Sequence, residues 1–393
     1  MRKFILVAGL ILLFAVEILR VYFIMPFPGS QKADTIGFAY WLGRNIIWLR
    51  ILLAVILIYP VVYALRNNRR WKKLALVLVL FLYFIVFYFV NFRFEADKMF
   101  YQPTVKTFYN RTENKVDSNK LVLGVLINGQ SKAYPVEVIG YHHQVRDSIS
   151  EKPVMVTYCT VCRTGRVYSP LVNGKPEEFR LVGMDHFNAM FEDAGTKSWW
   201  QQATGQAIAG KLKGTTLEEI PSQQMTLASW FRLHPNSTVL QPDGGFKKRY
   251  DDLEGYDEGT IAGGLEHRDS TSWSDKSWVI GVNYAPGKYK AYDWNELVKK
   301  QVIQDSAGNI PLLLTLDDDG KSFHTFNRRL ADQVFDFSIL HNDNTMTDRQ
   351  TGSLWTTDGT GIFGLMNGYQ LERLPSYQEF WHSWKQFHPG TEK

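Results

Sequence analysis

Cysteine is scarce in this sequence. Of its 393 residues only two are cysteines, Cys159 and Cys162, and they stand three positions apart in the stretch PVMVTYCTVCRTG. Several common catalytic signatures are missing: there is no glycine-rich phosphate loop, no G-x-S-x-G nucleophile elbow and no H-E-x-x-H zinc motif. The part that follows the apolar N-terminal segments has no stripe of basic and aromatic residues, so we expect no nucleic-acid partner. These absences direct attention to the cysteine pair.

Long apolar runs are confined to the first 93 residues. The runs at 4–25, 46–65 and 74–92 each come close to or exceed the roughly 20 apolar residues that a membrane-spanning helix needs. We therefore predict an integral membrane domain over residues 1–93 with three transmembrane helices. A signal peptide does not explain the first run, because two further spans follow it.

Basic residues indicate how these helices are oriented. Arg2 and Lys3 precede the first run, and five Arg and Lys side chains crowd the RNNRRWKK loop between the second and third runs. Positive clusters of this kind stay in the cytoplasm. We predict a multi-pass protein of the cell membrane with a cytoplasmic N-terminus. Residues 94–393 then form a periplasmic or extracellular domain.

A few charged side chains fall inside the predicted spans. Glu17 and Arg20 lie three residues apart and share a helix face, so we expect them to form a neutralised pair near the headgroups. We expect Arg50 to extend its side chain towards the membrane surface.

The C-terminal domain contains an internal duplication. The segment GVLINGQSKAYPVEVIGYHHQVRDSISEKPVMVTY aligns with GVNYAPGKYKAYDWNELVKKQVIQDSAGNIPLLLTL, and SWFRLHPNST aligns with SWKQFHPGT further along. Shared features come in the same order in both copies. We predict tandem structural repeats at 121–242 and 278–391, joined by a loop-rich linker at 243–277.

Each copy has mainly the sequence pattern of strands. The stretch LVLGVLINGQSKAYPV has β-branched runs on both sides of Asn128-Gly129, which is a strong hairpin signal. Short helical patterns, such as TLASWFRLHP, follow the strands. The predicted fold class is α+β and β-rich, with the two repeats preceded by three transmembrane helices.

The duplication supplies a comparison between residues that serve the fold and residues free to serve a site. Metal-binding or redox-active types in the first copy have different residue types opposite them in the second: Cys159 faces Asp317, Cys162 faces Gly320, and His142 faces Lys300. We infer that the first copy carries a site. His186 faces His341 and stays a candidate ligand, while the acidic run 317–319 reads as a solvated turn.

Three chemistries remain open for the cysteine pair. Two thiolates with His142, and with His186 as a further ligand, suit a soft transition metal, copper or zinc. A dithiol–disulfide couple is the second, although the residues after Cys162 read as a hairpin and not as the helix that usually activates such a thiol. The third is an inert pair that clamps a strand end, which stabilises little because the closed loop is so short.

These residues resemble a family of bacterial and archaeal proteins known only as a domain of unknown function. Its pattern is H-E-x-V-N-D, then V-T-Y-C-P-L-C, then D-R-Q-T-x-S-L-W. His142, Asp147 and both cysteines match the first two motifs, and DRQTGSLW at 348–355 matches the third. Thr160-Val161 replaces the Pro-Leu of the pattern, and His143 and Arg146 replace its Glu and Asn. The resemblance strengthens the site without naming a reaction.

The sequence therefore predicts a membrane-anchored extracytoplasmic protein with a Cys159/Cys162/His142 site, and it leaves open whether the protein is an enzyme. The site binds copper or zinc, or carries out metal-linked redox chemistry, with Cys159 and Cys162 as its reactive residues. Two alternatives remain: a thiol–disulfide redox protein, or a non-catalytic module with a structural cysteine pair that binds a protein or small-molecule partner.

Overall fold

The structure is a computed structural model, and it describes residues 1–261, 264–340 and 343–393. His341, the residue aligned with His186, lies outside the described residues. The described chain forms two compact units. The first unit contains residues 1–101, 177–201 and 205–216, and the second contains 102–176, 202–204 and the described residues of 217–393.

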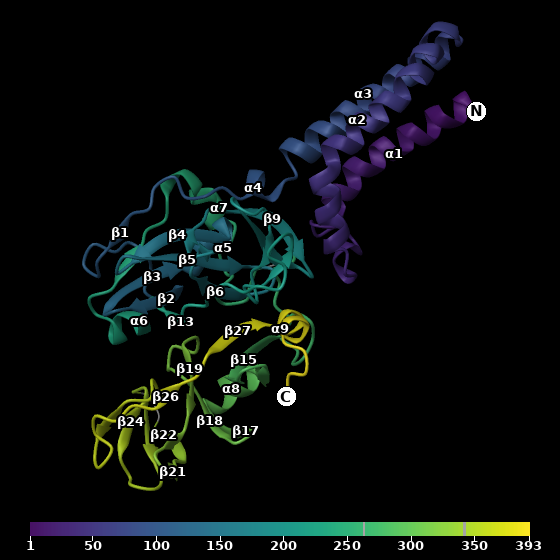
Figure 1. Cartoon of the computed structure of the whole chain (residues 1–393). Helices are drawn as coiled ribbons and strands as arrows, with labels where there is room; N and C mark the ends of the chain where they lie inside the picture. The colour runs from purple at the N-terminus through teal and green to yellow at the C-terminus, as the bar shows by residue number, and fades with distance from the viewer. Residues whose placement is uncertain (262–263, 341–342) are drawn as a thin grey trace. The chain divides into compact units, whose positions relative to one another are not determined.

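Three long helices dominate the first unit: α1 (Arg2–Tyr22), α2 (Ile36–Asn67) and α3 (Arg70–Phe92). Each is long and apolar enough to cross a membrane, as predicted. Figure 1 shows them packed into one bundle, in which α1 contacts both α2 and α3. Helix α2 begins ten residues before its predicted span. A short helix α4 (Ala96–Met99) follows the bundle.

A polar network ties the three helices together inside the bundle. Glu17 is fully buried, and both its oxygens accept hydrogen bonds from Arg50, each at 2.7 Å. Tyr83 of α3 donates to the same carboxylate at 3.0 Å. The predicted Glu17–Arg20 pair is wrong, because Arg20 instead binds Glu95 at 3.0 Å. The prediction for Arg50 is also wrong. The planar guanidinium of Arg50, on the neighbouring helix α2, binds both carboxylate oxygens of Glu17. Arg20, on the same helix as Glu17, pairs with Glu95 instead.

A four-stranded antiparallel sheet completes the first unit, in the order β12-β11-β10-β9. Its strands are β9 (Phe179–Asp185), β10 (Asn188–Asp193), β11 (Trp199–Gln201) and β12 (Ala207–Ala209). Met190 and Trp199 of this sheet pack with Ala39 of α2 in one buried cluster. Gly183 lets β9 approach the end of α1 so closely that the amide of Met184 donates to the carbonyl of Ile24 at 2.7 Å, where any Cβ at Gly183 would overlap that carbonyl.

In the second unit a short strand precedes a strand hairpin, which is followed by a short helix and further strands. The hairpin turns at Asn128-Gly129 with positive φ at both residues, as predicted. The elements, in order, are β1 (Phe108–Tyr109), β2 (Leu121–Ile127), β3 (Gln130–Pro135), α5 (Val136–His142), β4 (Gln144–Ile149), β5 (Lys152–Cys159), β6 (Thr164–Tyr168), β7 (Leu171–Val172), β8 (Lys175–Pro176), β13 (Ser222–Thr226), α6 (Leu227–Leu233), β14 (Thr238–Leu240) and α7 (Lys247–Asp251).

The rest of the unit runs through a similar order of elements. These are β15 (Trp278–Ala285), β16 (Lys288–Asp293), α8 (Trp294–Lys300), β17 (Val302–Ala307), β18 (Ile310–Leu316), β19 (Phe323–Asn327), β20 (Arg329–Leu330), β21 (Gln333–Val334), β22 (Phe337–Leu340), β23 (Thr345–Asp348), β24 (Leu354–Thr356), β25 (Gly361–Phe363), β26 (Glu372–Arg373), β27 (Ser376–Phe380) and α9 (Trp381–Phe387). The α+β, β-rich class is confirmed. A duplication behind this order stays a prediction.

Two tryptophans fix where the last helix of each half lies. Trp230 of α6 covers Gly124 in β2, and Trp384 of α9 covers Gly281 in β15; a Cβ at either glycine would overlap the indole. Both indoles are completely buried. The strands that precede these helices meet at Gln224 and Gln378, whose side chains hydrogen-bond at 3.0 Å. Helix α6 of the first half reaches the turn after β18, and helix α9 of the second half reaches the turn after β5.

Candidate functional site

The cysteines lie on the tight turn that joins β5 to β6. Cys159 is the last residue of β5, and the amide of Cys162 donates to its carbonyl at 3.3 Å. Arg163 then takes a positive φ of 55° to return the chain into β6. Strand β6 follows the turn, as predicted, so neither cysteine begins a helix of its own segment.

Both cysteines are completely buried thiols. The Cys159 side chain hydrogen-bonds Cys162, so the sulfurs are close neighbours. Burial raises the pKa of the Cys162 thiol well above its ordinary value, because a thiolate would be poorly solvated there. A hydrogen bond with Ser383 and the positive charge of Lys276 act in the opposite direction on that pKa.

Lys276 brings a cation against this turn from the linker before β15. Its Nζ donates to the carbonyl of Val161 at 2.7 Å and also to the carbonyl of Leu265. Burial lowers the pKa of Lys276, while both cysteines act to raise it. The ammonium is therefore the charged group best placed to stabilise a thiolate on this turn.

Helix α9 and the strand before it cover the turn from the far end of the chain. The amide of Phe380 donates to the carbonyl of Cys162 at 3.0 Å, and His382 Nε2 lies 3.2 Å from the carbonyl of Val161. Burial, with the Lys276 charge, lowers the pKa of His382 to about 4. His382 is therefore neutral at physiological pH.

Aromatic side chains hold the remaining atoms of the turn. The hydroxyl of Tyr256 donates to the carbonyl of Thr160 at 2.9 Å. Arg163 is fully buried over the ring of Trp278, 3.8 Å from its centroid, and donates to Gln378 at 2.8 Å. With its carbonyls bonded and its flanking side chains packed, the turn has little freedom in this state.

The predicted histidine ligands have other partners. His142 is buried in an aromatic group, and its Nε2 lies 2.7 Å from the hydroxyl of Tyr250. His186 belongs to the first unit, where Nδ1 lies 2.6 Å from Asp185, and that hydrogen bond raises its pKa. Within residues 1–261, 264–340 and 343–393, no group of three or more His, Cys, Asp or Glu side chains is placed to hold a metal ion. The copper or zinc site stays a prediction.

Sequence reasoning missed Lys276, Ser383 and His382. Ser383 aligns with Ser229 and therefore looked like part of the shared framework. His382 aligns with Ala228, so the copy-to-copy difference that singled out the cysteines also marks this histidine. Lys276 lies in the linker, where no such comparison exists.

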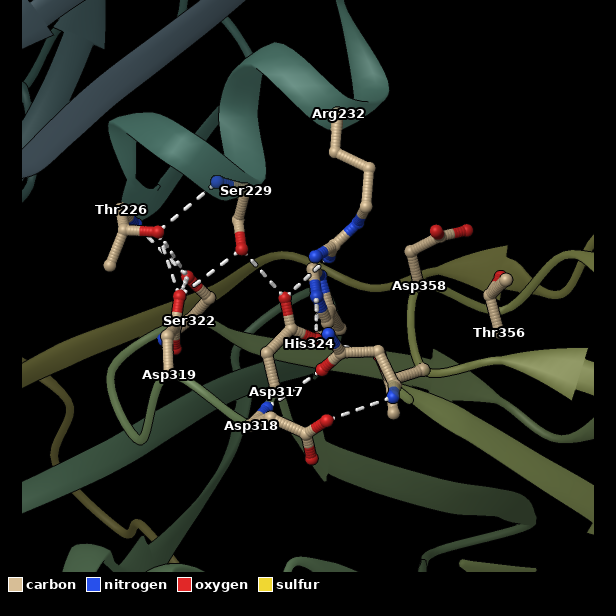
Figure 2. A network of polar contacts seen from close by, with 12 residues as sticks. Thr226, Ser229, Arg232, Asp317, Asp318, Asp319, Ser322, His324, Thr356 and Asp358 are labelled. Carbon is tan, nitrogen blue, oxygen red and sulfur yellow. Dashed lines mark hydrogen bonds and ion pairs between the residues drawn. The ribbon is translucent and has the colours of Figure 1, made fainter. Parts of the chain in front are cut away.

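The turn after β18 is the second half's equivalent in position. The amide of Gly320 donates to the carbonyl of Asp317 at 3.0 Å, as Cys162 does to Cys159. Figure 2 shows Ser229 and Arg232 pointing from helix α6 towards Asp317, which they bind at 2.9 and 2.6 Å. His324 Nε2 lies 3.1 Å from the same carboxylate, and the Thr357 hydroxyl donates to it at 2.6 Å. The predicted solvated turn is wrong for Asp317, which is buried, although Asp318 and Asp319 are exposed.

The DRQTGSLW motif forms a structural turn. One oxygen of Asp348 accepts hydrogen bonds from the Thr351 hydroxyl, the Ser353 amide and the Trp355 indole, at 2.8, 3.2 and 2.9 Å. These donors lower the pKa of Asp348 against the effect of burial. With all of these contacts made within one turn, the motif serves the fold.

These observations define a class of protein: helices long and apolar enough to span a membrane, with a β-rich domain that buries a pair of thiols on one turn. The chain belongs to the family described as Protein of unknown function (DUF3179), whose model matches residues 100–391. The predicted resemblance to a family of unknown function is thereby confirmed. No curated protein and no solved structure matches the chain significantly.

Proposed function

We propose that Cys159 and Cys162 form a dithiol–disulfide couple that exchanges electrons with a disulfide or dithiol of another molecule. The observation that carries this proposal is the hydrogen bond between the two side chains on a turn that also receives Lys276 and Ser383. Cysteine chemistry requires a thiolate, and a nearby cation lowers the free energy of that thiolate. Cys162, which both groups reach, is the attacking residue.

Lys276 is suited to take the Cys162 proton. Burial raises the pKa of Cys162 and lowers that of Lys276, so the two values move towards each other. From its neutral amine form, which burial favours, Lys276 can accept a proton from sulfur and leave an ammonium–thiolate pair. Because His382 is neutral, it adds no second positive charge that would oppose protonation of the Lys276 amine.

The exchange balances as follows. The Cys162 thiolate attacks a partner disulfide; a Cys162–partner S–S bond forms as the partner's own S–S bond breaks, and the leaving sulfur takes up a proton. Deprotonated Cys159 then attacks the Cys162 sulfur, which closes the Cys159–Cys162 disulfide and releases the second partner thiol. Two electrons and two protons pass to the partner. The reverse reaction oxidises a partner dithiol.

Orientation in the membrane bears on the direction of this exchange. The basic clusters before α1 and between α2 and α3 support a cytoplasmic N-terminus and an extracytoplasmic second unit. Disulfides persist in that compartment. We propose that the thiol site works in an oxidising environment at the cell surface or in the periplasm.

A copper or zinc centre is the second proposal, because two adjacent sulfurs are ligands that soft ions such as Cu(I) accept. His142 and His186 are the residues predicted to add nitrogen ligands. Binding would release the thiol protons that burial now retains. Metal analysis of the purified protein distinguishes this proposal from thiol exchange.

The deciding experiment titrates full-length protein in detergent against glutathione buffers and counts reactive thiols after denaturation. We expect one two-electron transition at roughly −300 to −120 mV, the range of thiol–disulfide proteins. The Cys159→Ser/Cys162→Ser variant should lose it, and metal content should be equal in the two proteins. A pair that stays reduced, or stays oxidised, throughout the titration would contradict the redox proposal; metal bound by the wild type alone would support the metal centre.

The role of Lys276 has a matched control in Lys385, an exposed lysine paired with Asp275. Lys276→Met should move the pH midpoint of Cys162 alkylation upwards, because the thiolate loses its cation. Lys385→Met should leave that midpoint unchanged. Equal midpoints in the two variants would remove Lys276 from the mechanism.

A further inference from the structure

The first unit contains a charged cavity of about 170 Å³ that the thiol chemistry does not use. It lies where the last turn of α1, the first part of α2 and the strands β9 to β11 come together. Four basic side chains line it: Arg20, Arg44, Arg180 and Lys197. A concave site with convergent cations is suited to an anion.

Two of these cations are already paired. Arg20 binds Glu95 at 3.0 Å, and Arg180 binds Glu192 at 2.9 Å. Both carboxylates also line the cavity. Asp97 lies 3.6 Å from Arg180, which further neutralises that side.

Arg44 and Lys197 are the two cations left over. In the described part of the chain, neither has a carboxylate oxygen within 4.0 Å, whereas Arg20 and Arg180 both do. Asp193, near Lys197 in the sequence, is bonded within its own turn by Thr196, Ser198 and Trp200. Among the described residues, two basic groups of the cavity therefore form no ion pair within 4.0 Å.

The length of α2 and its tryptophans argue that the cavity lies near the membrane surface. Helix α2 has 32 residues and is about 48 Å long, against a hydrocarbon thickness of about 30 Å. Arg44 follows its first two turns, between the exposed indoles of Trp41 and Trp48. Tryptophans of this kind mark the boundary between headgroups and hydrocarbon.

An apolar groove adjoins the charged cavity. It has a volume of about 420 Å³, runs between α1 and α3, and is lined by residues such as Ile18, Val86 and Phe89. Val21 and Phe94 line both the groove and the cavity, so the two lie side by side across these side chains. A ligand with a charged head and an apolar tail could occupy both at once.

We propose that this cavity binds the phosphate of an anionic phospholipid, with an acyl chain in the adjoining groove. Arg44 and Lys197 donate to the phosphate oxygens, and Arg20 and Arg180 add positive charge around them. Free inorganic phosphate has the same head chemistry, but it leaves the groove unfilled. The lipid belongs to the leaflet next to the sheet β9 to β12, and the inference does not depend on the proposed thiol function.

Full-length protein is placed in nanodiscs that contain equal amounts of phosphatidylglycerol and phosphatidylcholine. Native mass spectrometry then measures which lipid the released protein retains. We expect the wild type to retain phosphatidylglycerol selectively. Arg44→Gln/Lys197→Gln should bind it about 30-fold more weakly, from about fivefold for each charge lost near the membrane surface. The control Lys175→Gln/Lys211→Gln removes two exposed charges outside the cavity and should change nothing.

A second arm separates lipid from free phosphate. Val86→Trp fills the groove and keeps all four cations, so it should weaken lipid retention, and inorganic phosphate added in excess should not displace lipid from the wild type. Equal retention by the wild type and the Arg44/Lys197 variant would overturn the site. Retention unaffected by Val86→Trp, together with displacement by inorganic phosphate, would overturn the lipid assignment.

Discussion

Two turns of the second unit occupy equivalent places in their halves yet hold opposite chemistry. Cys159 ends a buried strand and Asp317 directly follows one, and each accepts a backbone hydrogen bond from the residue three positions on. A helix of the other half reaches each turn, with Ser383 beside the thiols and Ser229 beside the carboxylate. Cys159 and Asp317 are both almost completely buried.

The two turns differ in the groups that surround the buried Cys162 and Asp317 side chains. Burial raises the pKa of Cys162, and Ser383 and Lys276 offset this only in part. Burial also acts to raise the pKa of Asp317, but His324, Thr357 and Arg232 reverse the effect and lower it well below the ordinary value. Burial alone therefore does not determine charge; the donors that the fold supplies determine it. One turn holds a fixed anion and the other holds a neutral, latent nucleophile.

The largest expected effect comes from removing the fixed anion. Asp317→Asn leaves His324 and Arg232 without their carboxylate, which for a buried pair costs about 3 to 5 kcal/mol. We expect the free energy of unfolding to fall by about 3 kcal/mol, since Arg232 is partly exposed and its share is screened. Urea unfolding of the full-length protein, followed by tryptophan fluorescence, measures the change. The exposed Asp318→Asn is the control, and a loss below about 1 kcal/mol would contradict this account of Asp317.

The two turns should respond to opposite ends of the pH scale. The pKa of Asp317 is lowered in the folded protein. Its contribution to the free energy of unfolding is therefore complete above about pH 4 and is lost as the pH falls. The pKa of Cys162 is raised in the folded protein. Its contribution to the free energy of unfolding is therefore complete below the ordinary thiol pKa and is lost as the pH rises above that ordinary value. Each group changes the free energy of unfolding by at most about 1.4 kcal/mol per pH unit.

Unfolding measured across pH checks these slopes. Asp317→Asn should flatten the acid side alone, and Cys162→Ser the alkaline side alone. If Cys162→Ser leaves the alkaline slope of the wild type intact, the raised thiol pKa is not what limits stability there.

The two serines sharpen the comparison at smaller cost. Ser229 donates to Asp317, and Ser383 donates to Glu379 at 3.0 Å, so either alanine substitution should cost about 1 to 2 kcal/mol. Only Ser383→Ala should also slow thiol alkylation at a given pH, because that hydroxyl helps to lower the Cys162 pKa. The same slowing in Ser229→Ala would show that general loosening, and not the hydrogen bond, controls the thiol.

The smallest effect concerns a feature that the two halves share. Lys132 binds Asp147 at 2.8 Å, and Lys290 binds Asp305 at 2.6 Å. We expect about 1 kcal/mol or less for Asp147→Asn or Asp305→Asn, and less for Asp305→Asn because its side chain is 38% exposed against 13%. Alkylation of the cysteines should be unchanged in both variants. A larger cost for Asp305→Asn would break the equivalence of the two links.

Parts of the fold followed from local sequence because local forces specify them. Uninterrupted apolar runs predicted three long helices, and Asn128-Gly129 predicted a hairpin because both residues tolerate positive φ. The early start of α2 was not predictable from hydropathy: Ile36 to Asn45 is amphipathic, and its helix is stabilised by packing on β9 to β12.

The sequence by itself determined the rarity of cysteine, its spacing and its asymmetry between the two halves. These singled out Cys159 and Cys162, because composition and periodicity are properties of the chain alone. Only the tertiary structure decided what surrounds them. Lys276 and His382 lie 115 and 221 residues from Val161, whose carbonyl both contact. Long-range contacts of this kind arise from the pairing of whole strands and helices, so no local pattern encodes them, and the ionisation of a buried thiol depends on them.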